Sequence, residues 1–284
     1  PIANPVGLEQ VLMDVPLGRY ELQSGENFNR KFVDLSDTVG DQIEAHLTQD
    51  PAHNLALIRE CLRRALHAHP ALTPLQSQRL TLQRLACDAD MVLDLHCDFE
   101  SVVHLYTTPE AWPQVEPLAR YIEAQASLLA TDSGGQSFDE CFTLLWWQLQ
   151  ERFGEHFEIP LGSFSVTVEL RGQGDVNHPM ASRDCQALID YLIQFDAIVG
   201  ETKPQPPLPF PATPLAGVEA LNVDVMGQKM RVSYDAAVVT AAAIAAGWSA
   251  IRQGSADGPP TGLFTSLPIM WSESSDLAAE ISGT

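Results

Sequence analysis

Short apolar or β-branched runs alternate with longer segments of helical periodicity between residues 54 and 195. In the longer segments, leucine, isoleucine and alanine recur every three or four positions, which is the spacing of one face of an amphipathic helix. The expected helices are 54–69, 74–88, 114–130, 138–153 and 181–195, and the expected strands are 91–95, 102–106 and 163–170. This alternation predicts an α/β fold in which helices cover the faces of a sheet.

A proline-rich segment divides the chain. Half of the residues in 203–214 are proline, a composition that favours extended polyproline II and is typical of a linker between domains. We therefore expect an α/β domain at 1–202 and a small domain at 215–284. Expected strands at about 218–226 and 229–234 predict that the small domain is β-rich. The alanine-rich run at 236–248 is too short to span a bilayer.

The charge of the chain limits its partners. The sequence has 16 Lys and Arg against 37 Asp and Glu, which gives a net charge of −21. Such a surface repels phosphate backbones and anionic lipids, so we expect neither nucleic acid nor a membrane as a partner. An anionic small molecule would need an arginine placed close to it to overcome this background.

The cysteines indicate a reducing compartment. Five cysteines are widely spaced and include no C-x-x-C pair, so neither a zinc knuckle nor a disulfide framework is indicated. Reduced thiols are typical of cytoplasmic proteins, and the sequence shows no secretory signal. We therefore expect a cytoplasmic location.

Polar residues stand where two of the expected strands end. His96 directly follows the strand at 91–95, and Glu169 lies at the end of the strand at 163–170. Strand ends are the usual place for active sites in open α/β sheets. His96 is either a metal ligand or a strand-end residue that faces solvent. Glu169 is either an acid/base group or the structural partner of Arg171.

Four segments, taken in order, resemble the succinylglutamate desuccinylase/aspartoacylase family, which belongs to the zinc-carboxypeptidase-like hydrolases. The family has an N-P pair, then a [D/N]-x-N-R-x-F segment, then D-L-H after a strand, and finally a T-x-E strand end. The matching stretches are Asn4-Pro5, Asn27–Phe32, Asp94-Leu95-His96 and Thr167–Arg171. The resemblance covers about residues 1–200 and implies a zinc-carboxypeptidase-like mixed sheet flanked by helices.

The same resemblance implies a function. It implies a zinc-dependent amidohydrolase, a deacylase that cleaves carbon–nitrogen bonds other than peptide bonds in an N-acyl amino acid or a similar carboxylate-bearing amide. His96 would bind Zn²⁺, and Glu169 would take a proton from the zinc-bound water and pass it to the leaving amine. The resemblance implies a substrate-carboxylate site at Asn29 and Arg30, and a carbonyl-polarising role for Arg19. The implied partner is a small molecule with a carboxylate, and a homo-oligomer is left open.

One part of the family pattern does not occur in this sequence. The first two zinc ligands of the family lie in a G-x-H-G-x-E segment upstream of the N-P pair, and we expect these ligands before Pro1 in a longer protein. Two alternatives remain open. One is a metallocarboxypeptidase that acts on a peptide C-terminus, and the other is a non-catalytic carboxylate-binding protein that has lost its metal site.

Overall fold

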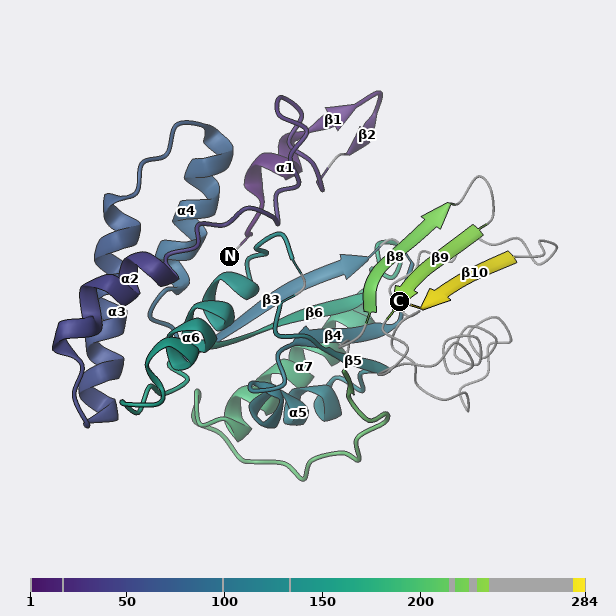
Figure 1. Cartoon of the computed structure of the whole chain (residues 1–284). Helices are drawn as coiled ribbons and strands as arrows, with labels where there is room; N and C mark the ends of the chain where they lie inside the picture. The colour runs from purple at the N-terminus through teal and green to yellow at the C-terminus, as the bar shows by residue number, and fades with distance from the viewer. Residues whose placement is uncertain are drawn as a thin grey trace. The chain divides into compact units, whose positions relative to one another are not determined.

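The computed structural model describes residues 2–16, 18–98, 100–132, 134–214, 218–224, 229–234 and 278–283. The chain forms two compact units. The first unit consists of Pro1–Asp94 and Thr131–Val166, and the second of Leu95–Ala130 and Thr167–Thr284. The helices and strands are labelled in Figure 1.

Helices make up most of the first unit. They are α2 (Ser36–Ile43), α3 (Pro51–Ala68), α4 (Pro74–Ala86) and α6 (Glu140–Phe153). Both α3 and α4 begin with a proline that follows a capping side chain. Asp50 accepts a hydrogen bond from the N–H of Ala52 at 2.9 Å, and Thr73 accepts one from Gln76 at 3.1 Å. These caps accept hydrogen bonds from backbone N–H groups that have no partner within the helix. Proline suits the first helical position because it has no N–H group that needs an acceptor.

The apolar faces of α2, α3 and α6 form the core of the first unit. Ile43 and Ile58 are fully buried, and Trp146 is 1% exposed. Each such side chain contributes about 2–3 kcal/mol on burial. The core therefore fixes α6, and with it the loop at 134–138 that leads into this helix.

The N-terminal segment of the first unit contains helix α1 (Pro5–Glu9) and a hairpin of β1 (Val11–Leu12) and β2 (Val15–Pro16). The two hairpin-turn residues, Met13 and Asp14, have φ of 51° and 64°. Positive φ at both positions is the geometry that joins two antiparallel strands with the right twist. The segment that carries Arg19, Asn29 and Arg30 follows this hairpin.

A mixed sheet has the strand order β3-β6-β4-β5-β7. Its strands are β3 (Met91–Asp98), β4 (Val103–Thr107), β5 (Ala126–Leu129), β6 (Phe164–Gly172) and β7 (Thr213–Pro214). β4 pairs in parallel with β5 and antiparallel with β6, and β5 pairs in parallel with β7. The predicted α/β architecture, a mixed sheet flanked by helices, is confirmed.

Two helices of the second unit pack against each other. They are α5 (Trp112–Tyr121) and α7 (His178–Gln194), and Figure 1 shows them side by side. The Tyr191 hydroxyl of α7 donates to the carbonyl of Gln114 in α5 at 3.0 Å. The proline-rich segment contacts α5, because Tyr121 donates to the Lys203 carbonyl and Arg120 donates to the Pro206 carbonyl.

Several sequence-based boundaries are wrong, and three of them concern the strands of the mixed sheet. The expected helix at 114–130 ends at Tyr121, because Glu123 takes φ of 54° and the buried run 126–129 pairs with β4 as a strand. The strand expected to end before His96 continues to Asp98, and β6 continues past Glu169 to Gly172. The two strands are neighbours in the sheet, and the N–H of Gln173 still donates to the Asp98 carbonyl. His96 and Glu169 therefore lie inside strands.

The described part of the C-terminal region contains three strands. They are β8 (Val218–Asp224), β9 (Lys229–Tyr234) and β10 (Ala278–Gly283), in the order β10-β9-β8. β8 and β9 lie where strands were expected, at about 218–226 and 229–234. The alanine-rich run at 236–248 and most of the predicted domain 215–284 lie outside the described residues, and the predicted domain boundaries stay predictions. Within the described ranges, no helix is long and apolar enough to cross a bilayer.

Candidate active site

His96 of β3 and Glu169 of β6 lie close together in the second unit. The Nδ1 atom of His96 is 3.9 Å from Oε1 of Glu169. The side chains are 29% and 14% exposed, respectively, so both are largely buried and both are still reached by solvent. The sheet thus brings together the two residues that the family resemblance assigned to the same zinc site.

The alternation of β3 separates its polar and thiol side chains. Successive strand residues point to opposite faces, so Asp94, His96 and Asp98 share one face while Cys97 points to the other. Burial raises the pKa of the Cys97 thiol, and the negative charges of Glu169 and Asp98 raise it further. The thiol is therefore protonated at neutral pH and is a poor nucleophile.

His104 of β4 lies directly opposite Glu169 in the antiparallel ladder. Directly opposed residues share one face of the sheet with Cβ atoms about 5 Å apart. His104 is fully buried, and this burial lowers its pKa against the opposing effects of the Val102 carbonyl and the charge of Asp98. Nδ1 is 2.8 Å from the Val102 carbonyl oxygen, so Nδ1 carries the proton of the neutral ring. His96, Glu169 and His104 thus lie side by side on three neighbouring strands. The Nε2 atom of His104 is a hydrogen-bond acceptor.

The sequence interpretation missed His104, although a histidine within the run VVHLY was a usable signal. Arg171, the structural alternative for Glu169, forms a salt bridge with Asp184 of α7, and both of these side chains are largely buried. Arg171 therefore has a charge partner of its own, and the assignment of Glu169 to acid/base chemistry stays a prediction.

Asn29 and Arg30 lie in the first unit, against the loop at 134–138. The Oδ1 atom of Asn29 accepts a hydrogen bond from the N–H of Phe138 at 2.8 Å. Nη1 of Arg30 donates to the carbonyl of Asn29 at 2.7 Å. The amide oxygen of Asn29 is thus used in a hydrogen bond within the protein. The amide NH₂ is the group that would donate to a ligand.

Arg79 of α4 holds the chain just before Asn29. Its guanidinium donates to the carbonyls of Asn27 at 2.7 Å and Phe28 at 3.3 Å, and to the Glu26 carboxylate at 2.9 Å. Hydrogen bonds from Lys31 and Arg79 lower the pKa of Glu26. Sequence reasoning missed Arg79, because an arginine on an amphipathic helix normally faces solvent, whereas this residue is only 4% exposed.

Arg19 also belongs to the first unit and is exposed. Its carbonyl accepts a hydrogen bond from the N–H of Phe28 at 3.0 Å, and its guanidinium carbon lies 5.9 Å from the centre of the Tyr20 ring. The predicted residues therefore form two groups. His96 and Glu169 belong to the second unit, and Arg19, Asn29 and Arg30 belong to the first.

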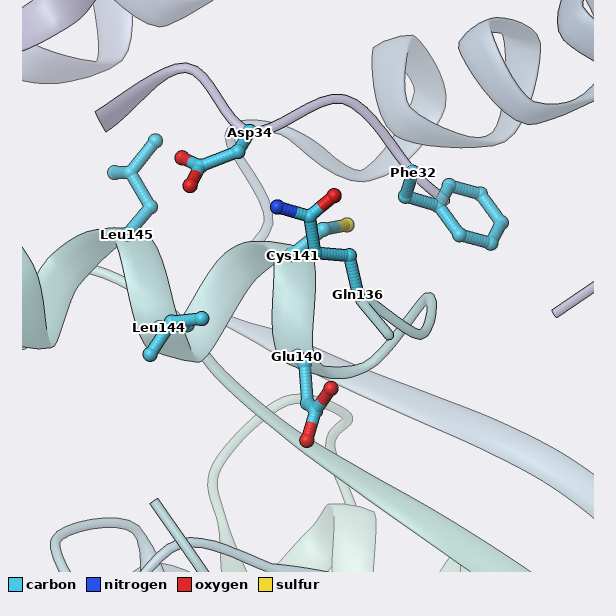
Figure 2. Close-up of a pocket in the computed structure, with 7 residues that line it drawn as sticks. All are labelled: Phe32, Asp34, Gln136, Glu140, Cys141, Leu144 and Leu145. Atoms are coloured by element: carbon cyan, nitrogen blue, oxygen red, sulfur yellow. The ribbon is translucent and has the colours of Figure 1, made fainter. Parts of the chain in front are cut away.

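A small cavity lies beside the start of α6 (Figure 2). It is lined by Phe32, Asp34, Gln136, Glu140, Cys141, Leu144 and Leu145, and its volume is about 10 Å³. That volume is close to the minimum for one water molecule, so the cavity is no substrate site. Burial raises the pKa of the Cys141 thiol well above its ordinary value, and nearby Asp139 raises it further.

The described residues fit a zinc centre only in part. A catalytic zinc site has three protein ligands and an open position. Within the described ranges, no group of three or more His, Cys, Asp or Glu is arranged to hold a metal ion. His96 is suited to be one ligand, with the Glu169 carboxylate beside it.

No family model and no curated protein matches the chain. Solved structures do match the chain, and two of them are of proteins assigned to the succinylglutamate desuccinylase/aspartoacylase family. The one from Shewanella frigidimarina NCIMB 400 is 25% identical with a TM-score of 0.65, over 78% of this chain and 61% of that chain. The one from Shewanella amazonensis SB2B is 28% identical with a TM-score of 0.64, over 79% of this chain and 65% of that chain. This chain thus spans less than two thirds of either. The chain has the fold of the succinylglutamate desuccinylase/aspartoacylase family, as its ordered motifs predicted.

Proposed function

We propose that the protein is a deacylase that hydrolyses the amide bond of an N-acyl amino acid or a similar carboxylate-bearing amide. The observation that carries this proposal is the pair of His96 and Glu169, 3.9 Å apart on neighbouring strands of a sheet with this family's fold. The names of the structural neighbours support the same class of reaction. They point to substrates such as N-succinylglutamate and N-acylaspartates.

Glu169 would move the proton. Its side chain is 14% exposed, and a carboxylate within hydrogen-bond reach of a water molecule can act as general base. The same carboxyl group would then donate the proton to the leaving amine. A general acid/base of this kind contributes about 10²–10⁴ in rate.

His96 would serve as one ligand of a zinc ion, with the remaining ligands supplied from outside the described residues. When bound, such an ion supplies an activated water and stabilises negative charge on the substrate oxygen. Arg19 would polarise the substrate carbonyl.

Arg30 and Asn29 would bind the carboxylate of the substrate. A guanidinium makes paired, directional hydrogen bonds to a carboxylate, and the Asn29 NH₂ can add another. In a chain with a net charge of −21, long-range attraction cannot recruit an anion. Recognition must then come from short-range contacts with a few fixed donors.

A substrate panel tests the proposal. The protein, supplied with zinc, is incubated with N-succinylglutamate, N-acetylaspartate, their carboxyl amides and short peptides, and the released amine is quantified. Turnover of the N-acyl amino acids that is abolished by a chelator, and strongly reduced in Glu169→Gln, supports the deacylase. Release of C-terminal residues from peptides alone would indicate a carboxypeptidase. Binding without any turnover, measured by calorimetry, would indicate a carboxylate-binding protein.

A further inference from the structure

The loop at 134–138 runs beside the segment that contains Arg30 and is joined to it on both sides. The N–H of Lys31 donates to the Gly135 carbonyl at 2.8 Å, and the N–H of Phe32 donates to the Gln136 carbonyl at 3.1 Å. The Phe138 N–H donates to Asn29 Oδ1 at 2.8 Å. These bonds fix the backbone of one segment against the other.

The side chain of Arg30 lies directly on Gly135. A Cβ atom at Gly135 would be 2.8 Å from Cδ of Arg30 and 3.2 Å from its Nε. The first of these distances is shorter than carbon atoms tolerate, since their optimal separation is about 3.5–4.0 Å. Arg30 can take this path only because residue 135 has no side chain.

Gly134 is a natural comparison for Gly135. The two residues have φ of +81° and +91°, so both adopt a backbone conformation that favours glycine. A Cβ atom at Gly134 would have no heavy atom within 4 Å. An alanine at either position would thus adopt a similarly unfavourable backbone conformation, but only an alanine at 135 would clash with Arg30.

We propose that Gly135 is a positioning residue that sets the orientation of the Arg30 guanidinium toward the substrate carboxylate. Two contacts define this orientation, the surface of Gly135 beneath Cδ and Nε and the bond from Nη1 to the Asn29 carbonyl. Two-point recognition of a carboxylate requires the planar guanidinium and the carboxylate to be aligned. A methyl group at residue 135 would push the side chain by several tenths of an ångström or more and misalign it. This inference rests on the carboxylate-binding role proposed above for Arg30.

The test compares Gly135→Ala, Gly134→Ala, Arg30→Ala and the double variant Gly135→Ala/Arg30→Ala. For the free-carboxylate substrate, or for a non-hydrolysable analogue in calorimetry, we expect Gly135→Ala to raise KM or Kd about 10-fold with kcat little changed. Gly134→Ala should leave both within about twofold. In the Arg30→Ala background, Gly135→Ala should add nothing, because contacting residues are not additive in a double-mutant cycle.

The outcomes separate the two proposals. Unchanged affinity in Arg30→Ala would refute the carboxylate role of Arg30. A large loss in Arg30→Ala, combined with equal behaviour of Gly134→Ala and Gly135→Ala, would refute the role of Gly135 alone. NMR of the wild type covers the case in which Gly135→Ala does not fold. The Nε–H order parameter of ligand-free Arg30 should exceed that of exposed Arg19, and equally low values would overturn the inference.

Discussion

Arg79→Met tests whether α4 holds the segment 26–32, which contains Asn29 and Arg30, the residues proposed to bind the carboxylate. The Arg79 side chain is 5% exposed, and its partner Glu26 is 31% exposed. Methionine retains most of the buried stem but removes the donors to the carbonyls of Asn27 and Phe28. A buried acceptor left without a donor costs about 1–3 kcal/mol, so we expect the free energy of unfolding to fall by about 2–4 kcal/mol. The partly exposed bond to Glu26 adds little.

Urea unfolding measures this loss, and Arg84→Met is the matched control. Arg84 lies on the same helix and donates to the carbonyls of Leu66 at 2.9 and 3.0 Å and His69 at 3.2 Å, away from the loop. Both variants should lose stability, but only Arg79→Met should raise KM, by about 10-fold or more, since small displacements of binding groups are costly. A loss below about 0.5 kcal/mol in Arg79→Met would refute the stability reasoning, because surface substitutions cost that little. An unchanged KM would refute the positioning role.

Three further predictions concern the site residues. Glu169→Gln should lower kcat by about 10²–10⁴ with KM and zinc content little changed, and near-wild-type turnover in steady-state assays would exclude it as the base. Arg30→Lys should discriminate less than the wild type between a substrate acid and its amide in kcat/KM, because it loses the planar fork; equal factors would exclude contact with the carboxylate. The pKa of His104 is lowered in the folded protein, so the unfolded chain binds a proton at this residue at a higher pH than the folded chain does. The free energy of unfolding should therefore decrease as the pH falls below about 6.5. Thermal unfolding against pH should show a shallower decline in His104→Phe, and an identical decline would show that His104 does not titrate as described.

Local signals predicted the helices well and the short strands less well. The helix expected at 74–88 begins at Pro74 in the structure, directly after the capping residue Thr73. The run 126–129 carries no periodicity that separates a buried strand from a helix. Its identity comes from pairing with β4, and that contact is tertiary and cannot be read from neighbouring residues.

The sequence singled out His96 and Glu169, whose roles stay predictions, but it did not single out the residues that contact the proposed site. His96 and Glu169 stand in recognisable motifs, and the sheet brings them together because β3 and β6 are neighbours. Arg79, His104 and Gly135 belong to no motif. Each matters because of a neighbour far away in sequence, so their roles depend on burial and contact rather than on residue type.

The two groups of site residues are therefore held in different ways, and this difference has a functional consequence. Glu169 lies within a strand, and a shift of its backbone would break ladder hydrogen bonds with β4. Asn29 and Arg30 lie in a loop that depends on Arg79 and on the backbone of 134–138. Loops tolerate change better than strands. Under the roles proposed above for Arg30 and Glu169, substitutions within 26–32 and 134–138 should alter which carboxylate is accepted. Substitutions within β6 near Glu169 should affect proton transfer for every substrate alike.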